Sequence, residues 1–355
     1  MIRLEARAQP AKHMVYLSPL LALSLMLLFG LLVFSVLGKD PLQAFQAFFI
    51  APLDDWYGWG ELLIKASPLA LIALGLSVGF RANIWNIGAE GQLTLGAIAA
   101  GGVALWLHDS ESVWVLPLMF VAGALGGMAW ATIPAVLKNR FNASEILVSL
   151  MLVYVATLLL SWLIHGPWRD PDGYGFPQSL LFSEAATLPI LLSGTRIHAG
   201  VLLTVVALGL SYIFFRWSVL AFQMRVVGLA PRAAAYAGFN EKRMVWVGLL
   251  AGGATAGLAG TIEIAGPIGQ LLIPLSPGYG FAAIIVAFVG RLHPVGILLA
   301  SLLMALLYLG GESAQMQLAL PSSVSGVFQG VLLFFLLATD VLINFRLRWV
   351  KEGRA

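Results

Sequence analysis

The chain contains no cysteine, and charged residues are scarce in it. Asp, Glu, Lys and Arg make up 10% of the 355 residues, whereas a soluble domain carries roughly 25%. The absence of cysteine excludes disulfide bonds, thiol catalysis and cysteine-based metal sites. The scarcity of charge, together with a 60% share of hydrophobic residues, excludes an ordinary soluble enzyme and indicates a protein embedded in a lipid bilayer.

Two catalytic motifs are also missing. No Lys is followed by Ser or Thr, as a phosphate-binding loop requires, so any ATP that drives the protein binds to another subunit. No HExxH zinc pattern occurs, and the five histidines are scattered. We therefore expect no enzymatic activity, no metal site and no cofactor in this chain. The net charge of +3 fits basic cytoplasmic loops and requires no nucleic acid as a partner.

Long apolar runs predict an all-α polytopic membrane fold, because a spanning helix needs about 20 apolar residues. We expect ten spans in a single membrane domain that covers residues 1–355, at about 15–38, 61–80, 91–107, 113–137, 145–165, 199–215, 244–265, 270–290, 294–310 and 322–345. This layout puts all but four of the 20 Lys and Arg residues on one side. The exceptions are Lys39, Lys65, Arg169 and Arg196. The positive-inside rule then places both termini in the cytoplasm.

The span at 270–290 is interrupted in its outer half by Pro274, Pro277, Gly278 and Gly280. A broken helix is tolerated inside a membrane where it lines a cavity or is buried in protein. A re-entrant hairpin is the alternative, and it changes the number of spans.

Small residues recur every four positions in two of the spans. Gly123 and Gly127 form one such pair, and Gly253 and Gly257 form another. Faces of this kind let helices approach closely in lipid. We interpret them as packing faces.

The longest polar interruption after Ile197 runs from Arg225 to Arg243, with the sequence RVVGLAPRAAAYAGFNEKR. Pro231 suits the first turn of a helix, Gly238 suits its C-terminal cap, and the Ala-rich stretch between them favours helix. The pattern predicts a short cytoplasmic helix between two spans. Two interpretations are open: a knob through which a soluble partner moves the protein, or an ordinary basic loop.

Polar side chains at membrane depth are costly and are candidates for a solute pathway. Asn86, Glu90 and Gln92 cluster in the stretch RANIWNIGAEGQ. Glu263 lies near the outer end of the seventh span, and Gln329 lies inside the tenth. The alternatives are helix capping or loop closure for the cluster, an interfacial position for Glu263, and a contact with a neighbouring helix for Gln329.

Six stretches together resemble one family, the permease subunits of ATP-binding-cassette (ABC) importers for nucleosides and related sugars. The first, NIWNIGAEGQLTLGA, resembles the family's NIGxEGQ motif, and VVGLAPRAAAYAGFN resembles its cytoplasmic coupling stretch. In order, the stretches are 83–97, 147–156, 226–240, 257–266, 278–296 and 316–330. The resemblance covers about residues 60–340, within the superfamily of branched-chain amino acid, ribose and nucleoside permeases.

The resemblance implies a type II ABC importer fold and alternating access in the cytoplasmic (inner) membrane of a bacterium. It implies a second, homologous permease, an ATP-binding subunit that carries ATP and Mg²⁺, and an extracytoplasmic substrate-binding protein of the BMP family. The stretch at 225–243 then becomes the coupling helix. Its ATPase-coupling residues are Gly228, Pro231, Arg232, Tyr236 and Gly238.

The chain departs from the family pattern at three places, and the first two put the identity of the solute in doubt but not the architecture. Val153 stands where the family has Asn, and Ala282 and Ala283 stand where it has an Asp-Gly pair. Leu229 and Ala230 replace a polar pair before Pro231. A nucleoside, a sugar or another small polar compound remains open.

Two other functions are weighed against import driven by ATP. An ion-coupled secondary transporter of a small polar solute predicts transport by this chain alone and a charged relay in the spans. A membrane protein without transport activity, such as a sensor, predicts no solute flux. The sequence contains neither an obvious proton relay nor a stretch that resembles a soluble signalling domain.

Overall fold

The computed structural model describes residues 2–7, 11–321 and 323–349. The chain divides into two compact units, one formed by Met1–Gly58 and Leu306–Ala355 and the other by Trp59–Ala305. Among the residues assigned from sequence to the tenth span and its basic flank, Ser322, Lys351 and Arg354 lie outside the described residues.

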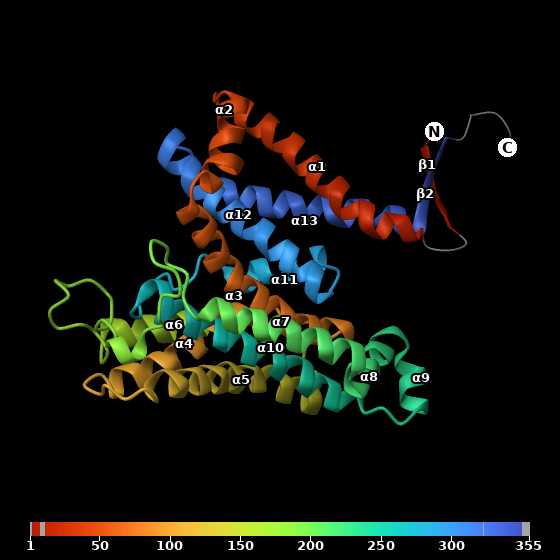
Figure 1. The fold of residues 1–355 in the computed structure, drawn as a ribbon. Helices are drawn as coiled ribbons and strands as arrows, with labels where there is room; N and C mark the ends of the chain where they lie inside the picture. Colours follow the sequence, from red (N-terminus) through yellow and green to blue (C-terminus); the bar gives the residue numbers. More distant parts are fainter. Residues whose placement is uncertain (1, 8–10, 322, 350–355) are drawn as a thin grey trace. The chain divides into compact units, whose positions relative to one another are not determined.

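The second unit is helical almost throughout (Figure 1). Its elements are α3 (Trp56–Arg81), α4 (Ala89–Trp106), α5 (Val115–Phe141), α6 (Glu145–His165), the 3-10 turn η3 (Glu184–Ala186), α7 (Gly200–Trp217), α8 (Val219–Leu229), α9 (Pro231–Tyr236), α10 (Glu241–Glu263), the π-helical turn η4 (Ile264–Ile268), α11 (Tyr279–Val289) and the first part of α12 (Pro294–Leu318). Side chains cap several helix starts. At the start of α10, for example, Asn240 accepts a hydrogen bond from the backbone N–H of Arg243 at 3.2 Å.

Helices α4, α5 and α10 pack on one another, with α5 along one edge of this unit (Figure 1). Glycine permits the close approach. A Cβ on Gly127 would overlap the carbonyl oxygen of Gly253, and a Cβ on Gly257 would overlap that of Gly123. The expectation that the glycines at spacing four are packing faces is therefore confirmed.

Eight helices in the described part of the chain are long and apolar enough to cross a membrane. They are α1, α3, α5, α6, α7, α10 with η4, α12 and α13. The two other expected spans are also helical: 91–107 corresponds to α4, which carries Glu90 and Gln92 in its first turns, and 270–290 corresponds to α11, which has 11 residues. The predicted break in the outer half of 270–290 is confirmed, because the helix starts only at Tyr279.

The outer segment between α6 and α7 runs along the chain that follows α10. The backbone N–H of Ser179 donates to the carbonyl of Leu271 at 2.9 Å, and that of Leu188 donates to the carbonyl of Ala265 at 2.7 Å. These bonds satisfy backbone groups of η4 and of the non-helical stretch before α11.

The first unit contains α1 (Lys12–Val36), α2 (Pro41–Phe45), the π-helical turn η1 (Gln46–Ile50), the 3-10 turn η2 (Ala51–Leu53), the last part of α12 and α13 (Ser323–Asn344). Helix α1 packs along α13. Ser18 donates to the carboxylate of Asp340 at 2.7 Å, and the hydroxyl of Thr339 donates to the carbonyl of Ser18 at 3.1 Å. The rings of Phe48 and Phe328 stack with centroids 4.7 Å apart.

The two ends of the chain pair as an antiparallel two-stranded sheet (Figure 1). Strand β1 (Ile2–Ala6) lies beside β2 (Phe345–Trp349), with Ile2 opposite Trp349. Arg346 forms an ion pair with Glu5 at 2.9 Å. The pairing brings the termini together on one side of any membrane that α1 and α13 cross. The sequence-based reading did not anticipate this sheet.

Candidate functional site

The stretch between the two spans at 199–215 and 244–265 folds as two short helices, α8 and α9. Pro231 occupies the first position of α9, where its missing N–H costs no hydrogen bond. Gly238 follows α9 with φ of +77°, the left-handed conformation that glycine adopts without strain. The backbone N–H of Phe239 then donates to the carbonyl of Ala234 at 2.9 Å. The predicted start and end of this short helix are confirmed.

Helix α9 presents its outer face to the surroundings. Tyr236 is 99% exposed, and Pro231 and Arg232 are exposed as well. Ala234, on the opposite face, is only 2% exposed and packs in an apolar cluster with Met224 of α8. The other cluster members are Ala82, Ile84, Ala131, Ala135, Val227, Met244, Val245 and Leu249. The result is a protruding helix whose inner face is anchored on α5, α8, α10 and the loop that follows α3.

Gly228 lies on α8, whereas the other four predicted coupling residues lie on α9 or directly after it. It lies on α8 against the end of α3, where a Cβ would overlap the carbonyl oxygen of Arg81 and come within 3.1 Å of the Cα of Ala82. Gly228 therefore sets the distance between α8 and α3. Of the five predicted coupling residues, the other four, Pro231, Arg232, Tyr236 and Gly238, are exposed.

Two of the polar residues in the 83–92 cluster bind each other. The side-chain amide of Asn86 donates to Oε1 of Gln92 at 2.8 Å, and that of Gln92 donates to Oδ1 of Asn86 at 3.1 Å. Oδ1 of Asn86 also accepts from the backbone N–H of Gly88 at 3.1 Å. Both side chains are almost fully buried, with 2% and 1% exposure. This arrangement closes the loop before α4, which was one of the two alternatives for the cluster.

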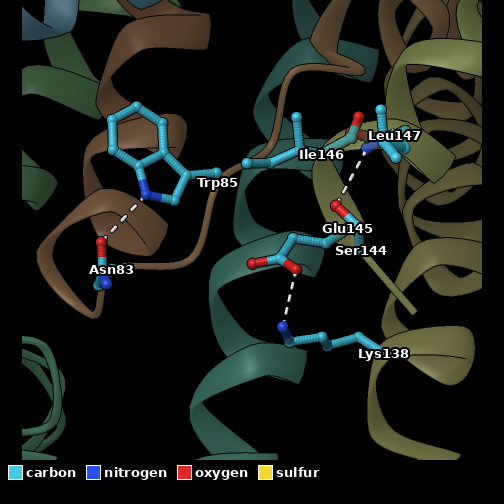
Figure 2. A network of polar contacts seen from close by, with 8 residues as sticks. Asn83, Trp85, Lys138, Ser144, Glu145, Ile146 and Leu147 are labelled. Atoms are coloured by element: carbon cyan, nitrogen blue, oxygen red, sulfur yellow. Dashed lines mark hydrogen bonds and ion pairs between the residues drawn. The ribbon is translucent and has the colours of Figure 1, made fainter. Parts of the chain in front are cut away.

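Figure 2 shows one further contact within this loop and two contacts between α5 and α6 or at the start of α6. The indole N–H of Trp85 donates to Oδ1 of Asn83 at 3.0 Å. Nearby, Lys138 of α5 forms an ion pair with Glu145 of α6 at 2.9 Å. Ser144 caps α6 by accepting from the backbone N–H of Leu147 at 3.5 Å.

Glu90 reaches from the first turn of α4 to the start of α11. Its Oε2 accepts from the backbone N–H of Gly280 at 2.6 Å, and its Oε1 accepts from the hydroxyl of Ser276 at 2.5 Å. The hydroxyl oxygen of Ser276 accepts in turn from the backbone N–H of Tyr279 at 3.1 Å. The carboxylate therefore joins two helix N-termini.

Glu263 lies at the end of α10 among charges from three other elements. It is 6% exposed, and it interacts electrostatically with Lys65, Arg196 and Glu90. Arg196 also forms an ion pair with Glu61 at 3.5 Å and donates to the carbonyl of Pro267 at 3.2 Å. We call Glu61, Lys65, Arg196 and Glu263 the charged cluster around Glu263, and Glu90 adds a repulsive interaction from the first turn of α4.

Lys65 and Arg196 were not chosen as site residues from the sequence. Both nevertheless gave a signal, because they are two of the four basic residues that depart from the charge asymmetry. The positive-inside rule does not account for a basic residue on the outer side of the membrane, so such a residue needs another interaction that favours its position. In this protein, Arg196 forms an ion pair with Glu61, and the charge of Lys65 attracts that of Glu263.

His198 packs in the same region, immediately before α7. Its Nδ1 accepts from the backbone N–H of Gly200 at 3.2 Å, and the side chain is 3% exposed. Burial, with a smaller contribution from the charge of Arg196, lowers the pKa of the His198 imidazole to about 4. The side chain is therefore neutral at pH 7.

Gln329 belongs to α13 in the first unit, apart from the other candidates, which all lie in the second unit. Its side-chain nitrogen is buried and has no hydrogen-bond partner among the described residues. Pathway roles for Asn86, Glu90, Gln92, Glu263 and Gln329 stay predictions. No group of three His, Asp or Glu side chains in the described part of the chain is placed to hold a metal ion.

Residues 59–337 match the family model described as the branched-chain amino acid transport system permease component. The glucose ABC transporter permease protein TsgB13 of Haloferax volcanii is 36% identical over 97% of this chain and 93% of its own length. The guanosine ABC transporter permease protein NupP of Bacillus subtilis is 29% identical, over 96% and 97%. The nucleoside ABC transporter permease protein NupB of Lactococcus lactis is 28% identical, over 96% and 95%. No solved structure matches the chain significantly.

Proposed function

The chain belongs to the family of branched-chain amino acid transport system permease components, and we propose that it carries a nucleoside or a related small polar solute, such as a sugar, into the cell. It is the membrane subunit of an ABC importer and carries no catalytic residue. The relatives named for guanosine, nucleosides and glucose support this class of solute. The departures at Val153, Ala282 and Ala283 leave the individual compound to experiment.

The observation that carries the proposal is the form of α9. A partner can move the membrane helices only through an element that is exposed to it and rigidly connected to them. Tyr236 and Arg232 are exposed, whereas Ala234 is packed in the apolar cluster beneath α9. A displacement of the exposed face therefore moves α8 and α10 with it, and alternating access follows as largely rigid-body motion.

The partners follow from this mechanism. An ATP-binding subunit docks on α9 and supplies ATP hydrolysis with Mg²⁺, a second homologous permease completes the membrane part, and an extracytoplasmic binding protein delivers the solute. Residues 1–355 act as one permease domain in the cytoplasmic membrane of a bacterium. The paired termini lie on the cytoplasmic side, together with the coupling stretch 225–243 and its basic residues.

The candidate polar residues for the solute pathway are Asn86, Glu90, Gln92 and Glu263 of the second unit and, taken separately, Gln329 of the first unit. The charged cluster around Glu263 supports an outer part of this pathway, since polar groups at membrane depth are costly unless they serve a function or one another. Lys65 and Arg196 extend the list by the same reasoning.

The test is ATP hydrolysis by the complete complex in lipid nanodiscs, with the binding protein and with nucleosides or sugars added. Arg232→Glu reverses a charge on the exposed face of α9 and leaves the apolar cluster intact. We expect it to abolish the stimulation of hydrolysis by solute. Arg169→Glu is the matched control, because it makes the same charge change at an exposed residue in the outer segment.

Two results contradict the proposal. If Arg232→Glu behaves like wild type and like the control, α9 is only a basic loop. If cells take up solute normally while the ATPase subunit is inactive, the chain is not an ATP-driven importer subunit. The solute that stimulates hydrolysis identifies the class.

A further inference from the structure

Helix α11 (Tyr279–Val289) is short and buried, so both of its ends need partners. It has 11 residues, fewer than the about 20 that cross a bilayer. Its buried residues are Tyr279, Gly280, Ala282, Ala283, Val286 and Ala287. Each end of a helix leaves backbone N–H or C=O groups without a partner inside the helix. In a membrane, other parts of the protein must satisfy them.

The N-terminal end of α11 is held by Glu90. The carboxylate accepts directly from the backbone N–H of Gly280 at 2.6 Å. It also accepts from Ser276, whose hydroxyl oxygen accepts from the backbone N–H groups of Gly278 and Tyr279 at 3.0 and 3.1 Å. One acidic side chain thereby fixes the first turn of α11 and the chain that leads into it.

The C-terminal end of α11 is held by Arg81. Its Nη2 donates to the carbonyl of Leu292 at 2.6 Å, in the turn that follows α11. The backbone N–H of Leu292 donates to the carbonyl of Ala287 at 2.8 Å, so this turn is continuous with the helix. The guanidinium carbon of Arg81 lies 3.6 Å from the centre of the Phe215 ring at the end of α7, which fixes its direction.

Aromatic rings join the same two stretches between these ends. Phe288 of α11 stacks on Phe80 with ring centroids 5.1 Å apart and on Trp85 with centroids 5.4 Å apart. Stacked pairs of this kind add to the stability that burial alone provides. The stretch 80–90 therefore contacts α11 at its start, near its end and in the turn beyond it.

We infer that residues 80–90 form a brace along α11, and that Arg81 and Glu90 are the positioning residues that hold its two ends. The signs of the charges fit, because an acid at the N-terminus and a base in the turn beyond the C-terminus both complement the helix dipole. The brace also touches α8, since Gly228 packs on the carbonyl of Arg81. A displacement of α8 and α9 is passed through Arg81 to the turn after α11.

This inference rests on the proposed function, because α8 and α9 must be the elements that the ATPase moves. The brace then explains how their motion reaches α11 through Arg81. Loss of Arg81 leaves α9 able to dock and the ATPase able to turn over. It removes the link between hydrolysis and the position of α11.

The experiment measures solute moved per ATP hydrolysed by the complete complex in proteoliposomes. We expect Arg81→Ala to lower this ratio about tenfold while ATP hydrolysis continues, the size of effect seen when a coupling contact is lost. Arg81→Lys restores part of the ratio, because lysine donates to the Leu292 carbonyl but lacks the planar group that stacks on Phe215. Glu90→Ala lowers the ratio in the same way, and Glu90→Gln does so less.

Lys138→Ala is the matched control (Figure 2). It removes a basic side chain that also ties two helices together, through its ion pair with Glu145, but neither helix is α11. We expect it to leave the ratio unchanged. If Arg81→Ala has the wild-type ratio, or falls no further than Lys138→Ala, the brace is refuted. If wild type itself shows no ATP-driven uptake, the proposed function fails first.

A second measurement covers the case in which Arg81→Ala does not assemble. The chain has no cysteine, so spin labels can be placed on Ala235→Cys in α9 and Phe281→Cys in α11 without removing native thiols. Both sites are exposed. We expect a narrow distribution of label distances in the presence of Arg81 and a broader one in Arg81→Lys. Equal widths overturn the inference.

Discussion

Replacement of Gly228 by alanine tests whether α8 is seated on the end of α3. The added Cβ would overlap the carbonyl oxygen of Arg81, lie 3.0 Å from its carbonyl carbon and lie 3.1 Å from the Cα of Ala82. All three atoms are backbone, so no side-chain rotation relieves the overlap and α8 must move. Overpacking of this kind costs about 1–3 kcal/mol.

Alanine is also a better helix former than glycine, by about 1 kcal/mol, and this gain offsets part of the cost. Gly209→Ala separates the two effects. Gly209 lies inside α7, and a Cβ there meets nothing within 4 Å. The difference between the two variants therefore isolates the overlap, and we expect Gly228→Ala to be less stable than Gly209→Ala by about 1–3 kcal/mol.

The assay is the free energy of unfolding in mixed micelles, followed by circular dichroism, together with solute-stimulated ATP hydrolysis by the complex. A displaced α8 misplaces α9, so the stimulation falls in Gly228→Ala and persists in Gly209→Ala. Equal stability and equal stimulation in the two variants refute the close seating of α8 on α3 and the role given to Gly228.

Three further predictions concern single side chains. Asn86→Ala leaves the buried amide of Gln92 without its partner and lowers the free energy of unfolding by about 1–3 kcal/mol; a double-mutant cycle with Gln92→Ala shows less destabilisation than the sum of the two single variants. The pKa of His198 is about 4 in the folded protein, below the ordinary value of about 6.5. Between these two pH values the unfolded chain therefore binds the proton more readily than the folded protein does. The free energy of unfolding consequently falls as the pH drops from about 6.5 towards 4, by up to about 3 kcal/mol. Tyr236→Ala leaves the unfolding free energy unchanged, because the side chain is exposed, but reduces solute-stimulated hydrolysis by the complex.

Each of the three has a result that contradicts it. Additive losses in the cycle mean that Asn86 and Gln92 do not depend on each other. An unaltered pH profile in His198→Gln means that another group titrates in that window. Normal stimulation in Tyr236→Ala means that the exposed face of α9 does not carry the contact with the ATPase.

The local features of the sequence determined the class of fold and the outline of the coupling stretch. The scarcity of charge and the long apolar runs specify membrane helices, because each backbone group in lipid must be satisfied within its own segment. Pro231 and Gly238 bound α9 through their own backbone preferences, which depend on no distant residue. Pro274, Pro277 and Gly278 delay the start of α11 to Tyr279 for the same reason.

The tertiary structure alone decided which polar residues meet. Glu90 binds Ser276 and Gly280, almost 200 positions away in the sequence, and Arg81 binds the carbonyl of Leu292. No period or spacing in the chain encodes such pairs, because they depend on how the helices between them pack. The sequence identified Asn86 and Gln92 as costly polar groups. Only the packing of the loop before α4 made them partners of each other.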